Sequence, residues 1–582
     1  MFRKYKANIE QHSKAMADVK VNDDFSAMVG EYEAAKDAKL RKYDVLRDLD
    51  LFVLDNSIRE STVGSLTGHT IENKWQIYNE VKKLGFKHRV VASFSHMTRV
   101  DDLFLQQLKD NGEDTDGMFA FSEITTSKRK NKVPNTENVP IGLKKMKQFG
   151  LHGAILEVDL SDVVYDFDKF PMTEMQNLMK KWIVWCHENL HKDAKVLINY
   201  RDLPDSMKDK PERIFQMTDF LGKLPADIRP FGIIFEDPTG SSLPEECGIW
   251  SRFLRQIMDN NDWKGHLLVH THEKYGLCDA TNLKALAFGC NGIWASVCCE
   301  GASMGAASSC VTITNLIRLG NKKVLKRYNC SYLRQAARNV TKITTEKEPH
   351  GRQIIYGKRA LEFVYSLDKG DFDMAKFFGE ENTMRITTVA TPEIIRLRLV
   401  HLFGENADFT TERTTKMKEK MLEDLRNNRK EEYQSMVGLA ILYDRAGGSL
   451  TEAMSEAISK METNSLHAER LIAEIREIWD TWDLKDTVQG KVQGDDMLEF
   501  DSFYNGFMAP YFGCYRCSDT KRALQAIDMD SDGGIDWKEF MVYLKWAIHE
   551  YPKIADSEEL LDVAFREGII PAMQDEILKK QG

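Results

Sequence analysis

The feature that most constrains the fold is a series of eight short apolar runs, rich in β-branched residues, that alternate with helix-like segments. Successive runs start mostly about 30 to 40 residues apart, which leaves room for a helix after each one. Uninterrupted apolar strands separated by helices are typical of a parallel sheet that is buried on both faces. The runs are LFVLD (51–55), RVVASFS (89–95), MFAFSE (118–123), GAILEVD (153–159), KVLINY (195–200), FGIIFED (231–237), HLLVHTH (266–272) and GIWASVC (292–298).

Eight strand–helix units predict an α/β fold of the (β/α)8 TIM-barrel type. The alternative is an open, doubly wound sheet, but the glycine-rich phosphate-binding loop of such sheets is absent after the first run. We therefore favour a barrel over residues 49–322. Residues 1–48 predict an N-terminal helical segment, 323–465 a helical accessory region, and 466–582 a further all-α domain that ends in a helix.

Composition narrows the class of function. The net charge of −10 over 582 residues disfavours nucleic acid as a partner. No apolar run approaches the roughly 18 residues that cross a membrane, and the N-terminus lacks the apolar core of a signal peptide. Ten cysteines without regular spacing indicate reduced thiols, and the lone CxxC pair Cys514 and Cys517 is half a zinc site at most. We expect a cytoplasmic protein, with an organelle as the alternative.

The most specific motif is a calcium-type loop, DMDSDGGIDWKEF, which runs from Asp528 to Phe540. Acidic residues stand at loop positions one, three, five, nine and twelve, and a glycine stands where the chain must turn sharply. An acidic surface turn would not require this spacing. The predicted calcium ligands are the side chains of Asp528, Asp530, Asp532, Asp536 and Glu539 and the backbone carbonyl of Gly534.

Calcium-type loops normally come in pairs, and an incomplete copy of the motif precedes the complete loop in the sequence. AERLIAEIREIWDTWD predicts the helix that enters this incomplete copy, and MLEFDSFYNGFM predicts the helix that leaves it. Leu498 is placed to pair with Ile535 of the complete loop. Ser502 stands where the bidentate glutamate belongs, so we expect no metal in this half. The region over about 466–550 resembles an EF-hand pair, which implies Ca²⁺ regulation in a eukaryotic cell.

A third stretch imitates the calcium pattern without satisfying it. GEDTDGMFAFSE (112–123) has acidic residues at similar spacing, but Gly112 offers no side-chain oxygen at the first position. The stretch also runs into the third apolar run. We therefore expect an ordinary turn that leads into a barrel strand.

Polar side chains gather where the apolar runs end, and in a (β/α)8 barrel these ends share the face where active sites lie. Residues two apart on a strand point to the same side, so His270 and His272 can reach one ion. A carboxylate from the first strand, across the barrel closure, can complete three protein ligands. The other groups at this face are Asp55, Arg59, Glu60, Ser95, His96, Glu157, Asp159, Asn199, Tyr200, Arg201, Asp202, Glu236, Asp237, Thr239, Cys298, Cys299 and Glu300.

Three stretches at this face resemble a known family. DNSIRES is similar to its first-strand motif, EDPTGSSLP to its sixth-strand motif and HTHEKYGLCDATNLKALAFGCNGI to its seventh-strand motif. The family is that of the Asp-Arg-Glu metallolyases, (β/α)8-barrel enzymes related to isopropylmalate synthase, homocitrate synthase, hydroxymethylglutaryl-CoA lyase and the carboxyltransferase domain of pyruvate carboxylase. The resemblance covers about residues 49–320, and the seventh-strand motif is its most specific part.

The resemblance implies a divalent cation, Mg²⁺, Mn²⁺ or Zn²⁺, held by Glu60, His270 and His272. It also implies that Arg59 stabilises the negative charge of an enolate while a carbon–carbon bond forms or breaks. The carboxyltransferase branch has a modified lysine that this chain lacks, and Glu236 stands near its place. The implied substrate is a keto or hydroxy acid, with a CoA thioester as one candidate, and the expected assembly is a homodimer.

The sequence supports two classes of function. The first is a divalent-metal-dependent lyase, aldolase or acyl-CoA-dependent synthase that Ca²⁺ regulates. The second is a catalytically inactive barrel that serves as a Ca²⁺-responsive binding or scaffold protein. For the first class, the candidates for the general base are Asp237, Tyr200, His96 and His350, and we expect Asp237 and Tyr200 to act beside Arg59 as catalytic residues.

Overall fold

The computed structural model describes the greater part of the chain. The chain forms two compact units: one runs to Glu362 and takes in a segment that ends at Asn382, and the other contains mainly the chain from Thr383 onward. The described residues are 26–59, 70–93, 99–125, 133–301, 304–363, 372–428, 433–485, 487–488, 491–492, 494, 496–508, 533–551, 554 and 556–569.

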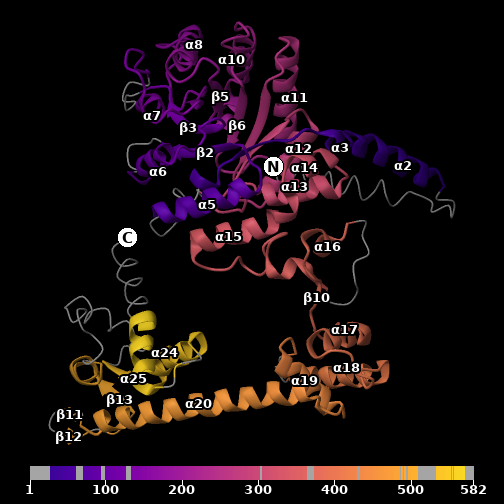
Figure 1. The fold of residues 1–582 in the computed structure, drawn as a ribbon, viewed down its shortest axis with the longest axis vertical. Helices are drawn as coiled ribbons and strands as arrows, with labels where there is room; N and C mark the ends of the chain where they lie inside the picture. The colour runs from indigo at the N-terminus through magenta and orange to yellow at the C-terminus, as the bar shows by residue number, and fades with distance from the viewer. Residues whose placement is uncertain are drawn as a thin grey trace, which may run out of the picture. The chain divides into compact units, whose positions relative to one another are not determined.

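The first unit is built on a closed barrel of eight parallel strands in sequential order (Figure 1). The barrel closes where β1 pairs with β8, with Phe52 opposite Gly292 and Asp55 opposite Ala295. Each strand falls on one of the eight apolar runs, so the predicted barrel is confirmed and the open sheet is excluded. The strands are β1 (Phe52–Asp55), β2 (His88–Ser93), β3 (Met118–Glu123), β4 (Gly153–Val158), β5 (Lys195–Tyr200), β6 (Gly232–Asp237), β7 (His266–Thr271) and β8 (Gly292–Ala295).

Side chains of the barrel strands alternate between two cores. Every second residue points into the barrel, while its neighbours, such as Val53 and Ile198, pack outward against the helices. Both faces are therefore buried, which explains why the runs contain so few polar positions. The side chains that fill the barrel interior are Phe52, Leu54, Val90, Phe119, Phe121, Ile155, Leu197, Ile234, Leu268 and Trp294.

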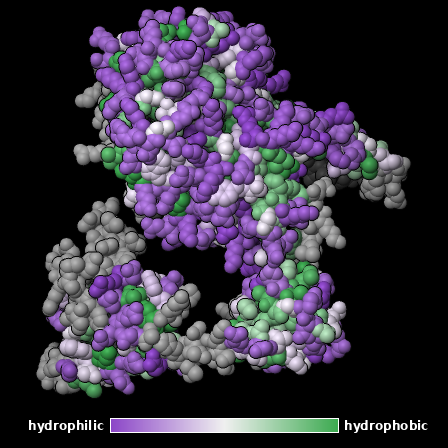
Figure 2. Space-filling view, in the orientation of Figure 1, coloured by the Kyte–Doolittle hydropathy of each residue, from purple (hydrophilic) through white to green (hydrophobic). Residues whose placement is uncertain are grey.

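Helices surround the barrel and connect its strands (Figure 1). Side-chain caps start several of them: Thr70 Oγ1 accepts from the amide of Asn73 in α5, and Ser308 Oγ accepts from the amide of Val311 in α13. The surface that the barrel presents in Figure 2 is mostly hydrophilic. The helices are α5 (Ile71–Lys83), α6 (Arg99–Asp110), α7 (Ile141–Phe149), α8 (Met172–Asn189), α9 (Leu203–Asp209), α10 (Pro211–Gly222), α11 (Pro244–Asn260), α12 (Cys278–Ala287) and α13 (Ser309–Arg318).

Further short elements flank the barrel in the chain. The buried Arg334 fixes the segment that follows the barrel, because it donates to Glu380 Oε1 at 2.6 Å and to the Gly357 carbonyl at 3.2 Å. The stretch 112–123 forms a turn that leads into β3, as the sequence predicts. The flanking elements are α2 (Ser26–Leu40), η1 (Arg41–Tyr43), α3 (Val45–Asp48), α14 (Lys322–Arg327), η2 (Cys330–Tyr332), α15 (Leu333–Thr345), η3 (Lys358–Leu361), β9 (Glu362–Phe363), α16 (Met374–Phe378) and β10 (Thr383–Met384).

The second unit contains a helical core that follows the barrel unit in sequence. Its buried side chains include Leu399, Met417 and Tyr443. The apolar periodicity of the sequence predicts helices in this region, and the structure has them. They are α17 (Pro392–Phe403), α18 (Thr411–Arg426), α19 (Met436–Arg445) and α20 (Glu452–Asp483).

A separate apolar core gathers the C-terminal elements. A short antiparallel ladder lies in it, because β13 pairs with β14 and Leu498 stands opposite Ile535. Both residues are fully buried in a core that contains Trp479 and Phe540. The sequence predicts this pairing of Leu498 with Ile535. The elements are β11 (Thr487–Val488), β12 (Lys491–Val492), β13 (Met497–Glu499), α21 (Phe500–Ser502), η4 (Phe503–Phe507), β14 (Gly534–Asp536), α24 (Trp537–Glu550), α25 (Ser557–Val563) and η6 (Ala564–Ile569).

None of the helices in the described ranges is both long enough and apolar enough to cross a membrane. The longest of them, α20, has 32 residues but carries charged side chains along its length. The described cysteines are all free thiols, and all of them except Cys299 are buried. Cys514 and Cys517 lie outside the described residues.

Candidate metal centre

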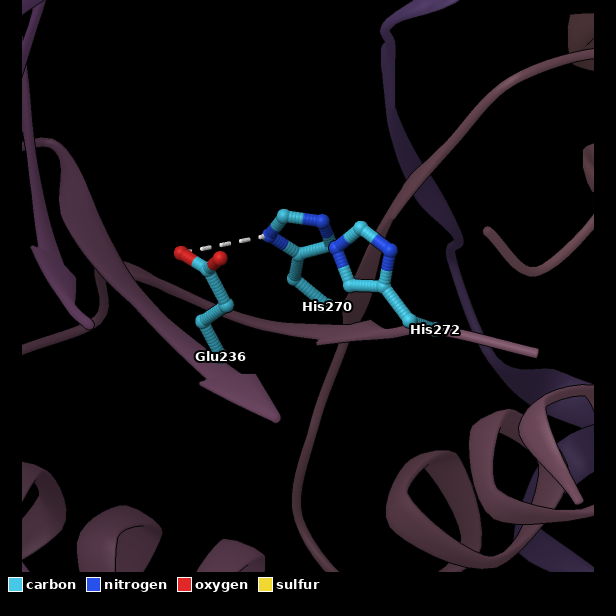
Figure 3. Close-up of side chains that lie close together, drawn as sticks. All are labelled: Glu236, His270 and His272. Atoms are coloured by element: carbon cyan, nitrogen blue, oxygen red, sulfur yellow. Dashed lines mark ion pairs between the residues drawn. The ribbon is translucent and has the colours of Figure 1, made fainter. Parts of the chain in front are cut away.

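Two histidines and a glutamate lie together at the carboxyl ends of the barrel strands (Figure 3). His270 lies in β7 and His272 follows its end, while Glu236 lies in the neighbouring β6 as the register partner of His270. One ligand atom from each side chain lies within 4.8 Å of the other two. Figure 3 shows the three side chains pointing toward one another. The structure therefore brings the two histidines to one place, as their spacing of two residues on a strand requires.

The third member of this cluster is Glu236, a residue to which the sequence assigned no ligand role. Glu60, the expected third ligand, lies outside the described residues, so its place in the metal site stays a prediction. Glu236 stands two residues after Ile234, which faces the barrel interior, and so faces inward itself. The alternation of side chains along β6 could have identified Glu236 from the sequence, because it puts this carboxylate on the same face as the inward-facing apolar residues.

His270 has the surroundings of a metal ligand. Its side chain is 2% exposed, and neither ring nitrogen has a hydrogen-bond partner among the described residues. Burial, together with the charges of His272 and Arg59, holds the pKa of His270 well below its usual range, so the ring is neutral and can donate a lone pair. Glu236 Oε2 lies 3.6 Å from Nδ1, which is too far for a hydrogen bond. A divalent cation would satisfy these groups together, so the donor set fits a metal.

A second buried carboxylate lies close to the cluster. Asn199 of β5 donates from Nδ2 to Glu236 Oε2 at 2.8 Å and to Glu157 Oε1 at 3.5 Å. Burial and the charge of Glu236 raise the pKa of Glu157 to about 7, and burial also raises the pKa of Glu236. The sequence places Glu157 and Asn199 at strand ends. They belong to this site because each stands two residues after a side chain that faces the barrel interior.

Two guanidinium groups act on these carboxylates. Arg59 lies over the ring of Phe121, 4.9 Å from its centroid, on the inner side of the barrel. Its charge acts on Glu157 and Glu236, and the partly buried Arg201 acts on the same two residues. The arginines partly offset the charge of the buried carboxylates, so a cation held at this cluster would keep part of its charge available to an anionic ligand.

Tyr200 and Asp237, which the sequence suggested as catalytic residues, do not join the cluster. Tyr200 faces outward from β5, where its hydroxyl shares a 2.9 Å hydrogen bond with Thr218 of α10. Asp237 accepts from the amides of Ser242 at 2.9 Å and Thr239 at 3.2 Å, in the turn after β6. A shift of one residue along a strand moves a side chain to the opposite face. The two side chains therefore stabilise the barrel wall and the turn.

Backbone contacts hold His272 from both sides. Its amide donates to the Asp237 carbonyl at 3.3 Å, and Ala306 is its antiparallel bridge partner on the other side. Gly240 has a φ of +61°, and a Cβ at this position would lie 1.8 Å from the His272 carbonyl oxygen. The turn after β6 therefore needs a glycine both for its left-handed backbone and for its close approach to the ligand strand.

Of the two remaining candidates for the general base, the structure describes only His350, which does not enter the cluster described above. His96 lies outside the described residues. His350 is an exposed residue in the turn region after α15. The two cysteines after β8 differ in burial: Cys298 is buried, whereas Cys299 is partly exposed and receives a 3.3 Å hydrogen bond at Sγ from Gln353.

The calcium-type loop is described from Gly533 onward. Gly533 has a φ of +96°, as the sharp turn of the motif requires. Asp536 Oδ1 accepts from the amide of Glu539 at 2.7 Å, and Glu539 Oε2 accepts from the amide of Asp536 at 3.0 Å. These two predicted ligands form a capping box at the start of α24, and Gly534 lies in β14. The predicted ligands Asp528, Asp530 and Asp532 lie outside the described residues.

Comparison with known proteins gives similar structures but no sequence family. No protein-family model matches the chain, and no curated protein sequence matches it. An HMG-CoA lyase from Brucella melitensis is similar to it with a TM-score of 0.40 and 12% identity, over 51% of this chain and 99% of that one. A hydroxymethylglutaryl-CoA lyase from Pseudomonas aeruginosa gives 0.40 and 12%, over 52% and 95%. The carboxyl transferase domain from Rhizobium etli pyruvate carboxylase with 3-hydroxypyruvate gives 0.35 and 13%, over 55% and 52%. These values assign no function, and the barrel fold rests on the strand order of this chain.

Proposed function

We propose that the chain is a divalent-metal-dependent enzyme that makes or breaks a carbon–carbon bond next to a keto or hydroxy acid. The observation that carries the proposal is the buried His270, whose ring nitrogens lack hydrogen-bond partners among the described residues while Glu236 and His272 lie beside it. Three protein ligands at the carboxyl ends of barrel strands leave coordination positions for a substrate. The sequence motifs that resemble those of the Asp-Arg-Glu metallolyases supply the reaction class.

The residues in and around the cluster have different roles in such a reaction. Glu236, His270 and His272 would hold the divalent cation, which would supply Lewis acidity toward a carbonyl or hydroxyl oxygen. Arg59 provides a fixed positive charge that opposes the negative charge of an enolate. Glu157, with a pKa raised to about 7, can hold or accept a proton near the cluster at neutral pH.

The donor set also bears on which cation the site prefers. Mg²⁺ prefers oxygen ligands and keeps several of its waters, whereas imidazole nitrogen suits first-row transition metals. Two imidazoles and one carboxylate therefore favour Zn²⁺ or Mn²⁺ over Mg²⁺. A competition experiment in which Mg²⁺ displaces Zn²⁺ and Mn²⁺ from the wild-type protein at equal free concentrations would contradict this preference.

Metal analysis of the full-length protein tests the proposed function. We expect about one equivalent of a bound divalent cation at the barrel, its loss in His270→Ala, and its retention in His350→Ala, which removes an exposed histidine. A wild-type barrel that binds no divalent cation contradicts the proposal. A screen of the metal-loaded protein against hydroxy acids and their CoA thioesters for carbon–carbon cleavage products then identifies the substrate.

A catalytically inactive barrel that acts as a Ca²⁺-responsive scaffold is the second candidate. The positions of Tyr200 and Asp237 support this second candidate. Both suggested catalytic residues lie outside the cluster, and their side chains make hydrogen bonds to other parts of the barrel. The substrate screen separates the two candidates. A protein that binds metal with high affinity but releases no product from any hydroxy acid, keto acid or thioester supports the scaffold.

We also propose that Ca²⁺ binds the C-terminal loop and regulates the protein. The pairing of Leu498 with Ile535 and the capping contacts of Glu539, which is 7% exposed, support this proposal. Glu539→Gln is expected to weaken Ca²⁺ binding strongly, while Glu477→Gln on an exposed part of α20 leaves it unchanged. If activity and oligomeric state are the same in Ca²⁺ and in chelator, the ion is structural.

The CoA thioester, the homodimer and the cytoplasmic location remain predictions from the sequence. Light scattering of the full-length protein in Ca²⁺ and in chelator measures the oligomeric state. Binding of free CoA to the metal-loaded protein tests whether the substrate is a thioester.

A further inference from the structure

Asn199 bridges the two buried carboxylates at the carboxyl end of the barrel strands. Its side chain is fully buried, and Nδ2 donates to both Glu236 Oε2 and Glu157 Oε1. Only the NH₂ half of the amide can donate to a carboxylate, so the two neighbours fix which way the amide is turned. Asn199 Oδ1 therefore points away from both carboxylates, and it has no hydrogen-bond partner among the described residues.

Strand register explains why this residue occupies the bridge. Asn199 stands directly opposite Glu157 in the β4–β5 pair, and Glu236 lies on β6, the next strand on the other side. All three residues have the parity of the barrel interior. Without a donor between them, two buried carboxylates would repel each other and each would lack a hydrogen bond, which is unfavourable in a low-dielectric interior.

We infer that Asn199 is a positioning residue for the metal centre: its amide turns the Glu236 carboxylate toward the two histidines and keeps Glu157 apart from it. The inference rests on the proposed function, because it needs a cation at the cluster. The oxygen that accepts from Asn199 is also the oxygen that lies 3.6 Å from His270 Nδ1. The amide therefore fixes the carboxylate oxygen that faces the histidine, in the way that hydrogen-bond partners orient ligands at metal sites.

Calorimetric titration of the full-length protein with Mn²⁺ and with Zn²⁺ tests this role. Asn199→Leu keeps the size and burial of the side chain but removes its donor, and we expect the affinity to fall by roughly 10- to 100-fold. Asn282→Leu is the matched control. Asn282 of α12 is also fully buried, has an Oδ1 with no partner among the described residues, and donates to Thr312 Oγ1 at 3.3 Å instead of to a carboxylate. The Asn282→Leu variant should bind Mn²⁺ and Zn²⁺ with the affinity of the wild type.

A second substitution separates positioning from a general effect on the fold. Glu157→Gln in the Asn199→Leu background removes one negative charge and places a new amide beside Glu236, so part of the lost affinity should return. Asn199→Ala replaces Asn199→Leu in both proteins if circular dichroism shows that the leucine variant does not fold. A merely structural role for Asn199 predicts no recovery in the double variant.

Besides the absence of recovery in the double variant, three further results would overturn the inference. The first is equal affinity of the wild type and Asn199→Leu, and the second is an equal loss in Asn282→Leu. Both leave the proposed function standing, because the wild type still binds its cation. The third is a wild-type protein that binds neither Mn²⁺ nor Zn²⁺ at the cluster, which removes the proposed function together with the inference.

Discussion

The imidazole of His270 stacks face to face on the indole of Trp294, with ring centroids 4.5 Å apart and planes inclined by 7°. Trp294 extends from β8 into the barrel interior and is fully buried. Because the nitrogens of His270 make no hydrogen bond within the described residues, ring contacts orient its imidazole, and this parallel stack is the closest of them. The seventh and eighth strands thus hold the histidine between them.

Trp294→Leu is therefore expected to weaken metal binding and to lower the free energy of unfolding by about 3 kcal/mol or more. Trp294→Phe keeps a ring for the stack and should retain most of the metal affinity. Trp182→Leu is the control, since Trp182 is buried outside the barrel, where its Nε1 donates to the Ile124 carbonyl. It should lose stability alone. Equal loss of metal affinity in Trp182→Leu, measured by calorimetry beside denaturant unfolding, would refute the stacking role.

The third metal ligand can be identified by comparing two glutamates. Glu236→Gln keeps the hydrogen-bonding shape of the side chain but removes its charge, so we expect the barrel cation to bind at least tenfold more weakly. Glu60→Gln tests the residue that the sequence suggested. If Glu60→Gln abolishes binding while Glu236→Gln leaves the affinity unchanged, the ligand set is the one inferred from the family resemblance.

Gly240→Ala should disturb the metal centre without touching a ligand side chain. The new Cβ would lie 1.8 Å from the His272 carbonyl oxygen, so the strand end that carries this histidine must move. We expect weaker metal binding and a loss of stability above the ~1 kcal/mol of a strained backbone. Gly150→Ala is the matched control, because Gly150 has a φ of +68° but open space around its Cβ position. A metal affinity in Gly240→Ala equal to that in Gly150→Ala would argue against the clamp on His272.

Acid should destabilise the barrel through two histidines at its amino-terminal end. Burial lowers the pKa of His88 to about 3 and that of His266 to about 4, from 6.5. The folded state holds both rings neutral, so the stability they allow is complete above pH 6.5 and falls as the pH drops toward 3. The limit is about 1.4 kcal/mol per pH unit for each ring, reduced by partial exposure. In metal-free protein, His266→Phe, which can keep the 4.0 Å stack on Phe52, should flatten the dependence of unfolding free energy on pH. An unchanged slope between pH 6.5 and 4 would contradict this origin.

The barrel could be predicted from the sequence because each of its strands has a recognisable pattern of apolar residues. A strand that is buried on both faces needs an uninterrupted apolar run, and eight such runs with helices between them leave few topologies. The pairing of Leu498 with Ile535 was predictable for a similar reason, since the position after the loop glycines has a fixed partner in a paired loop.

The site could be predicted only in part, because the face that a strand residue presents depends on single-residue register. His270 and His272 share a face whatever that register is. Tyr200 and Asp237 each stand one residue from an inward position, and their place at a strand end did not reveal that they point outward. Glu236 lies beside the histidines because β6 pairs with β7 in a particular register, and this register is known only from the three-dimensional structure.

The loop after β8 returns to the end of β7 and pairs with it. The amide of Glu273 donates to the Gly305 carbonyl at 3.1 Å, and the amide of Ala307 donates to the Thr271 carbonyl at 3.2 Å, on either side of His272. Residues 305–307 are therefore tied to the strand end that carries His272. A motion that lifts them breaks the backbone hydrogen bonds on either side of this proposed ligand, so we expect such a motion to loosen any cation held there.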